Sequence, residues 1–138
     1  MANEAVIIEL CGQPKGRPLT FSVVDATRIE KGALCALYDP RSMSGASFNM
    51  DGSLPFAGIA AAEKVASDGS TTLAAWTEGV FDLKNGVGTV NVGKLVSLSG
   101  ANVVYQAAAT DVENGYVVGK ALEEGAANEI IAVAVGIY

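Results

Sequence analysis

Apolar and polar residues alternate along much of this chain in runs of about four to eight residues. A period of two is typical of β-strands that bury one face, and the runs are separated by Gly, Asn, Asp, Ser or Pro, as turns are. The pattern predicts strands at residues 19–24, 33–38, 56–63, 71–76, 79–83, 94–98, 102–107, 117–122 and 129–135. Residues 60–66 also suit a short helix because Ala, Glu and Lys favour one, although the repeat described below favours a strand end.

Connections between these strands are predicted from their turn residues. Residues 67–70 and Asn85-Gly86 are expected to turn the chain, and residues 39–55 are expected to form its longest exposed loop. In the last strand, one predicted core face carries Ile131, Val133, Val135 and Ile137, and the opposite face carries Ile130, Ala132 and Ala134. A strand that is apolar on both faces is expected inside a closed barrel or at a subunit contact.

Two stretches of the chain follow one template. Residues 29–37 resemble residues 90–98, and residues 57–60 resemble residues 118–121. Gly32 and Gly58 are 26 residues apart, as are Gly93 and Gly119. Residues 72–81 and 129–138 close the two copies, with a loop four residues shorter in the second. The repeat predicts an all-β fold, a small β-barrel or sandwich of two similar β-units packed together.

The first 18 residues differ from the rest of the chain. Residues 5–10 favour a strand, but residues 12–18 contain two prolines and two glycines, which interrupt regular structure. We therefore expect residues 1–18 to form a flexible, extended N-terminal arm and residues 19–138 to form a single β-rich domain. The first ten residues have no basic region and a short apolar run broken by Glu9, so no signal peptide is expected.

Composition narrows the classes of function. Half of the 138 residues are apolar, enough for a core without metal or disulfide, and no apolar run is long enough to span a membrane. The net charge of −6 disfavours nucleic acid, whose binding requires a basic surface. We expect a soluble protein made in a reducing cytoplasm, with Cys11 and Cys35 as small apolar side chains; a disulfide between them is possible but has no support.

Candidate chemistry is sparse. The chain has no His, no zinc-binding spacing and no nucleophile elbow, so no catalytic residue, metal site or cofactor is predicted. Residues 12–16 lack phosphate-loop spacing, and residues 49–53 lack the repeated acidic ligands of a calcium loop. Glu123 and Glu124 are neighbours that would point to opposite faces of a strand. The scattered aromatic residues are expected to be core or interface anchors, and the subunit interface is assigned to Trp76, Ile130 and Tyr138.

Several of these segments resemble the capsid cement, or decoration, proteins of tailed bacterial and archaeal viruses. The resemblance covers most of the chain and is carried by residues 3–9, 16–18, 29–32, 56–60, 69–72, 79–83 and 118–123. It implies a non-enzymatic virion protein, made in the host cytoplasm, that binds the outer capsid surface. The implied partners are the major capsid protein and the chain itself, with a homotrimer expected first and a dimer second. Such a protein stabilises the expanded shell against genome pressure.

The arm is the candidate capsid contact, because a β-prone segment can add a strand to an exposed sheet edge. The residues assigned to it are Ala5, Val6, Ile7, Ile8, Glu9, Leu10, Pro14 and Arg17. Two other classes of function remain open. One is a virion-surface module that binds a host receptor or glycan through residues 39–55, since recognition often lies in long loops. The other is a small enzyme that uses carboxylates alone.

Overall fold

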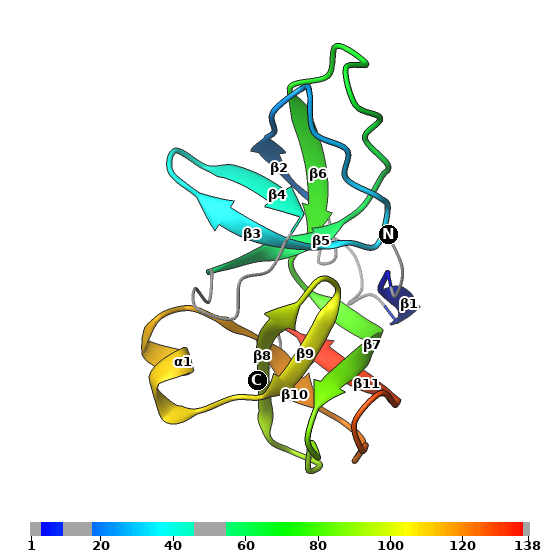
Figure 1. Cartoon of the computed structure of the whole chain (residues 1–138), viewed down its shortest axis with the longest axis vertical. Coiled ribbons are helices and arrows are strands. Elements are labelled where there is room, and N and C mark those ends of the chain that lie inside the picture. Colours follow the sequence, from blue (N-terminus) through cyan, green and yellow to red (C-terminus); the bar gives the residue numbers. More distant parts are fainter. Residues whose placement is uncertain (1–3, 10–17, 46–54, 137–138) are drawn as a thin grey trace.

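The computed structural model of the chain describes residues 4–9, 18–45 and 55–136. Two five-stranded barrels follow each other along the long axis of the molecule (Figure 1). The first consists of β2 (Leu19–Ser22), β3 (Leu34–Tyr38), β4 (Ser42–Gly45), β5 (Phe56–Ala60) and β6 (Thr72–Trp76). The second consists of β7 (Gly79–Val87), β8 (Leu95–Gly100), β9 (Val103–Gln106), β10 (Val117–Ala121) and β11 (Ile130–Val135). The predicted all-β fold of two similar units is confirmed.

Both barrels have the same topology. Their strand orders are β2-β4-β3-β5-β6 and β7-β9-β8-β10-β11, and each barrel closes because its last strand pairs with its first. The pairs β2–β4 and β7–β9 are parallel. The other pairs within each barrel are antiparallel. Two elements lie outside this plan. They are β1 (Val6–Glu9), which pairs with β7, and the helix α1 (Ala109–Glu113), which lies between β9 and β10.

The glycines of the repeat occupy equivalent turns. Gly32 and Gly93 have φ angles of +86° and +82°, a region that L side chains rarely adopt. Each donates its N–H to the last residue of the fourth strand of its barrel, at 2.8 Å: Gly32 to the Ala60 carbonyl and Gly93 to the Ala121 carbonyl. The glycine spacing seen in the sequence therefore reflects one backbone arrangement built twice.

The last strands of the two barrels, β6 and β11, also correspond to each other. Their pairing differs by one residue from the alignment of Gly79 with Gly136 in the sequence repeat. Ala60 lies opposite Ala75 in the first barrel, and Ala121 lies opposite Val133 in the second. Ala75 and Val133 are therefore equivalent, and the connection between the fourth and fifth strands is three residues shorter in the second copy rather than four. The difference arises because Gly79 begins β7, a strand of the second barrel.

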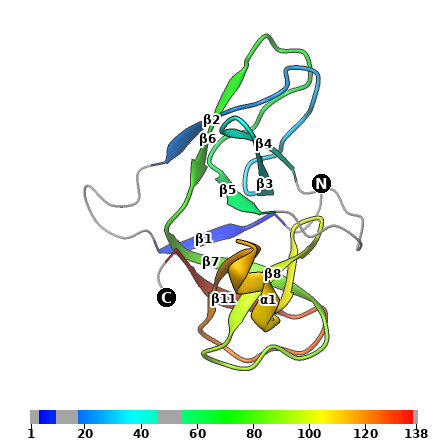
Figure 2. The ribbon, with the colours of Figure 1, turned by 90° about the vertical axis from the view of Figure 1, so that its left-hand side faces the viewer.

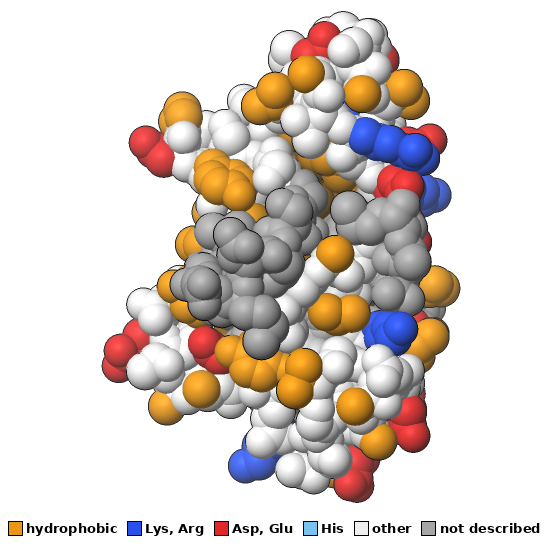
Figure 3. All heavy atoms as spheres, in the orientation of Figure 1, with side chains coloured by type: hydrophobic (Ala, Val, Ile, Leu, Met, Phe, Trp, Pro, Cys, Tyr) orange, Lys and Arg blue, Asp and Glu red, His pale blue; other side chains and the backbone are white. Residues whose placement is uncertain are grey.

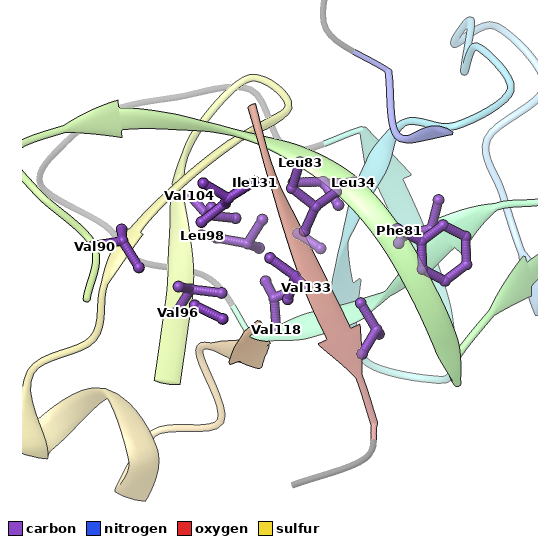
Figure 4. Packing of buried hydrophobic residues seen from close by; sticks show 14 residues of the cluster. Leu34, Phe81, Leu83, Val90, Val96, Leu98, Val104, Val118, Ile131 and Val133 are labelled. Atoms are coloured by element: carbon purple, nitrogen blue, oxygen red, sulfur yellow. The ribbon is translucent and has the colours of Figure 1, made fainter. Parts of the chain in front are cut away.

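The hydrophobic core has two parts. One fills the first barrel and includes Phe21, Ile29 and Cys35. The other fills the second barrel and extends to Leu34, Ala36 and Ile59 on the outer face of the first; Figure 4 shows Leu34 beside Leu83. The side-chain Oδ1 of Asn102 also accepts the N–H of Leu34 at 2.9 Å. The two barrels therefore share one continuous apolar contact, and β3 is apolar on both faces for this reason.

The last strand shows the same two-sided burial. Ile131, Val133 and Val135 belong to the core of the second barrel, as predicted, and Ile137 lies outside the described residues. Ala132 and Ala134 on the opposite face are also buried, whereas Ile130 is 65% exposed. Burial in the closed barrel therefore accounts for the face with Ile131, Val133 and Val135, whereas Ala132 and Ala134 are buried outside that core cluster.

Two local predictions are corrected, and one helix was not predicted. Asn85-Gly86 does not turn the chain: β7 continues through it because the Asn85 amide is buried and Gly86 packs under Val103. The predicted 39–55 loop contains β4, which pairs with β3; residues 46–54 lie outside the described part. Residues 61–66 form no helix, and the single helix of the described chain is α1, which the sequence pattern did not predict. Within the described ranges, no helix has the length and apolar character needed to cross a membrane.

Candidate functional site

The β-prone part of the predicted arm forms β1, which is paired within the molecule. It runs antiparallel to β7, with Val6 opposite Asp82 and Ile7 opposite Phe81. The predicted strand is confirmed, but it is not free, which corrects the expectation of an arm separate from the body. The reason lies in β7, whose pairing with β9 begins only at Lys84. The first half of β7 would otherwise present an unpaired edge, and β1 satisfies it.

The start of β1 is anchored on the other barrel. The N–H of Ala5 donates to the Gly32 carbonyl at 2.6 Å. A Cβ at Gly32 would lie 2.7 Å from the Ala5 carbonyl oxygen and 2.8 Å from the Glu4 Cβ, so this contact requires glycine. The segment 4–9 therefore connects both barrels, and Figure 2 shows β1 between them.

A groove with a volume of about 300 Å³ lies between β1 and the first barrel. Val6 is 60% exposed and Ile7 39% exposed, so this part of β1 presents apolar surface to solvent. Within the described part of the chain, β7 is the only strand that pairs with β1, so the second edge of β1 has no strand partner there. The groove is lined mainly by apolar side chains, with one charged residue: Val6, Ile7, Lys31, Ile59, Ala60 and Trp76.

The predicted subunit-interface residues have different environments. Trp76 is half-buried against the core shared by the barrels, so much of its contact is within the chain. Its indole Nε1 is buried and has no hydrogen-bond partner among the described residues. Ile130 is largely exposed on the second barrel, opposite Lys84. Tyr138 lies outside the described residues, as do Leu10, Pro14 and Arg17 of the predicted arm; for Ile8 and Glu9 only the backbone is described.

One buried charged group stands out. Lys64 is 1% exposed, and its Nζ donates to Asp68 Oδ1 at 2.7 Å and to Asp25 Oδ1, the Asp25 carbonyl and the Val65 carbonyl at 3.0 Å each. Burial opposes the charge on Lys64, but the hydrogen bonds to Asp68 and Asp25 outweigh it and raise the Lys64 pKa. The hydrogen bond from Lys64, supported by the Ser70 N–H, lowers the pKa of Asp68 to about 2. This arrangement stabilises loops and offers no neutral amine for catalysis.

Reactive chemistry is not organised elsewhere in the described residues. Cys35 is a free, buried thiol, and burial raises its pKa to about 12, so it is a poor nucleophile. No group of three His, Cys, Asp or Glu side chains in the described ranges could hold a metal ion. In Figure 3 the apolar side chains form several small groups on the visible face, and the few Lys and Arg side chains do not form a broad basic patch.

Two elements of the site were missed by sequence reasoning. The Gly32 turn is visible in the repeat, but nothing in the sequence shows that residues 4 and 5 cover it. Lys64 has a usable signal, because it lies opposite Ile29 where the second repeat has Gly125 opposite Val90. A long cation at a position occupied by glycine in the other copy indicates that the two barrel ends are built differently.

The apolar groove beside the edge strand β1 is suited to binding another protein. A comparison with curated proteins finds no match. The family described as phage cement protein matches residues 13–137, which is nearly the whole chain. The chain therefore belongs to the phage cement protein family.

Proposed function

We propose that this protein binds the outer surface of an icosahedral capsid and stabilises the expanded shell against the pressure of the packaged genome. Membership of the cement family supports a structural, capsid-associated role. The observation that carries the finer proposal is the exposed apolar strand β1, whose Val6 and Ile7 border the groove between the barrels. The partner is the major capsid protein, and no catalytic step is involved.

The two-barrel body is suited to this role because it is rigid. The barrels share a core, and β1 is fixed to both of them through β7 and the Gly32 carbonyl. A capsid segment that covers Val6 and Ile7 would gain up to about 2 kcal/mol for each fully buried side chain. Binding at many equivalent positions on a symmetric shell multiplies this modest gain. Strain in the shell then has to break many contacts held by stiff connectors.

Self-association belongs to the same proposal. We place the subunit contact of a homotrimer at the exposed Ile130, with Tyr138 and the groove-facing part of Trp76 as further contacts. Ile130 supports this because its apolar side chain is 65% exposed and would lose that exposure in a subunit contact. Sedimentation velocity of the free protein distinguishes trimer, dimer and monomer.

The test uses expanded heads that lack the protein, from the virus that encodes it, and compares Val6→Asp with Val92→Asp. Both valines are similarly exposed, at 60% and 62%, but Val92 lies in the turn before Gly93 on the second barrel. A carboxylate at residue 6 would be buried on binding, so we expect V6D to bind about tenfold or more weakly and V92D to bind as wild type. Sedimentation measures occupancy, and release of DNA on heating measures stabilisation. Heads that rupture at the same temperature with and without wild-type protein would contradict the proposed function.

A further inference from the structure

The edge of β7 is shared by two neighbours. Its second half pairs in parallel with β9, beginning at Lys84 opposite Val103. Its first half pairs with β1, with Asp82 opposite Val6 and Phe81 opposite Ile7. In the second barrel, a parallel strand therefore covers one half of this edge and an added antiparallel strand covers the other half.

The repeat identifies the same edge in the first barrel. Leu19 of β2 lies opposite Ala75, as Phe81 of β7 lies opposite Val133, and Ala75 and Val133 are equivalent. Leu19 and Thr20 therefore correspond to Phe81 and Asp82, the residues that β1 covers. The correspondence has an independent check. Ser22 pairs in parallel with Ser42 at the start of β4, as Lys84 pairs with Val103 at the start of β9.

This edge of β2 is uncovered within the described residues. The single pairing of β2 with β4 is at Ser22, and no described strand lies beside Leu19 and Thr20 on that side. Leu19 is 46% exposed, and Thr20 is exposed as well. Figure 2 shows β2 at the margin of the first barrel, with β6 as its neighbour.

The backbone groups of Thr20 point outward from this edge. The N–H of Ser22 donates to the Arg41 carbonyl on the β4 side, whereas the N–H of Val23 donates to the Thr71 carbonyl on the β6 side. Backbone direction alternates along a strand, so the N–H and C=O of Thr20 lie on the same side as those of Ser22. Thr20 therefore presents one donor and one acceptor to an incoming strand.

We propose that β2 accepts an extended strand of the major capsid protein, antiparallel to β2, at Leu19–Thr20. The proposal rests on the proposed function and assigns it a second contact on the other barrel. The equivalent edge of β7 is covered by β1, a short antiparallel strand rich in apolar residues. We expect the strand that pairs with β2 to have the same character. With β1 in one contact and β2 in the other, a single copy would join two capsid segments through its shared core.

Charge at the edge indicates the chemistry of the incoming strand. Arg41 lies beside it, with its guanidinium carbon 5.8 Å from the centre of the Phe21 ring, and it forms no ion pair with the described residues. A shallow hollow of about 480 Å³ is bordered by Phe21, Leu37 and Tyr38 and by two charged residues, Asp39 and Arg41. An apolar side chain would fill the hollow, and a carboxylate on the incoming strand would pair with the guanidinium of Arg41, which Asp39 does not neutralise through an ion pair. The capsid protein is favoured over a second copy because the β1 strand of each copy is already held on its own β7.

The test compares Thr20→Pro with Thr20→Val in binding to expanded heads that lack the protein. Proline removes the outward N–H and its ring blocks strand addition, but it leaves the β6 ladder intact. Valine keeps the backbone groups and the shape of the side chain. We expect T20P to bind about tenfold or more weakly and T20V to bind within about twofold of wild type. The melting temperature of T20P should stay within about 4 °C of wild type.

Each outcome is decisive. Equal binding by T20P and wild type would overturn the inference alone, and so would equal losses by T20P and T20V. If T20P fails to fold, Arg41→Glu replaces it, because reversal of this exposed charge should weaken binding about tenfold; unchanged binding by R41E would overturn the inference. An oligomer of the free protein that T20P dissociates would assign the edge to a second copy and overturn the capsid assignment. Wild-type protein that does not bind heads would instead contradict the proposed function itself.

Discussion

The two barrels close equivalent ends with different side chains. In the first barrel, the buried ammonium of Lys64 donates to the Val65 carbonyl and to Asp25 and Asp68. In the second barrel, the buried Asn85 Nδ2 donates to the Gly88 carbonyl at 2.7 Å and the Ala126 carbonyl at 3.1 Å. Val65 and Ala126 are equivalent, because each follows the residue that pairs with Ile29 or Val90. Both barrels therefore satisfy inward-facing carbonyl groups with a side-chain N–H donor.

The difference follows from the space available beside the bridge. Gly125 stands where the first barrel has Lys64, and a Cβ at Gly125 would collide with the Ile131 side chain. The donor in the second barrel must come from another strand, and β7 supplies it through Asn85. The Nδ2 of a neutral amide needs only carbonyl acceptors, whereas an ammonium needs carboxylates as well. The first barrel is therefore expected to respond to charge and pH at a place where the second does not.

Lys64→Met should give the largest effect. Methionine fills similar volume but leaves two carbonyl groups without their donor and two carboxylates close together without a cation. We expect the melting temperature to fall by about 10 °C, measured by calorimetry at neutral pH. Lys94→Met is the control, because Lys94 is exposed, and it should change the melting temperature by about 2 °C or less. Equal melting temperatures for K64M and wild type would show that the buried ammonium does not hold this end of the barrel.

Much of the repeated architecture could be predicted because local rules and the repeat agree. Alternating residues identified most strands, and the spacing of Gly32 and Gly93 identified two equivalent turns. Such features are dictated by backbone geometry within a few residues. These strands and turns could be predicted because both copies of the repeat need the same residue types at the same positions.

The features that were predicted wrongly, or not predicted, depend on residues far away in the sequence. Asn85-Gly86 has the composition of a turn, but the Asn85 amide is needed to satisfy carbonyl groups about forty residues later. The helix α1 begins where Asp111 Oδ2 accepts the Ala108 N–H and the Tyr105 hydroxyl, a cap that the apolar pattern did not reveal. The pairing of β1 with β7 was missed for the same reason. Strand propensity was evident in the sequence, but the choice of partner depends on which edge the rest of the fold leaves open.

The Gly32 and Gly93 turns provide a matched test of the β1 anchor. Alanine at either position incurs the cost of a positive φ angle, about 1 kcal/mol. Only at Gly32 would the new methyl group also meet the segment 4–5, because at Gly93 no described atom beyond the glycine and its two chain neighbours lies within 4 Å of the Cβ position. We expect Gly32→Ala to destabilise the protein by about 1–2 kcal/mol more than Gly93→Ala in urea unfolding.

Hydrogen exchange separates the causes. Amides of residues 6–9 should lose protection in G32A and keep it in G93A, because only the first substitution displaces the start of β1. Equal free energies of unfolding, with equal protection of β1, would mean that the contact between Ala5 and Gly32 contributes little. The same pair applied to heads would then show whether capsid binding needs β1 in this position.

The smallest effect should come from Asp68→Asn, and its pH dependence is more informative than its size. The pKa of Asp68 is lowered from an ordinary value of 3.8 to about 2, chiefly by the hydrogen bond from Lys64. A lowered carboxyl pKa adds stability that is complete above pH 3.8 and is lost as the pH falls towards about 2. Lys64, whose pKa is raised, stays protonated throughout this range and adds no slope of its own. Thermal melts of D68N should therefore lie below wild type at neutral pH and approach it between pH 3.8 and about 2.

Asp82→Asn is the matched control for this pH dependence. Asp82 lies on the second barrel, and none of the described side chains forms a hydrogen bond or ion pair with its carboxylate, so D82N removes a carboxyl group without breaking such a contact. A constant difference between D68N and wild type down to pH 2 would mean that the Lys64–Asp68 pair is as strong with a protonated carboxyl as with a charged one. The contrast between a charged and a neutral barrel end would then be one of shape alone, because the two ends would have the same dependence on pH.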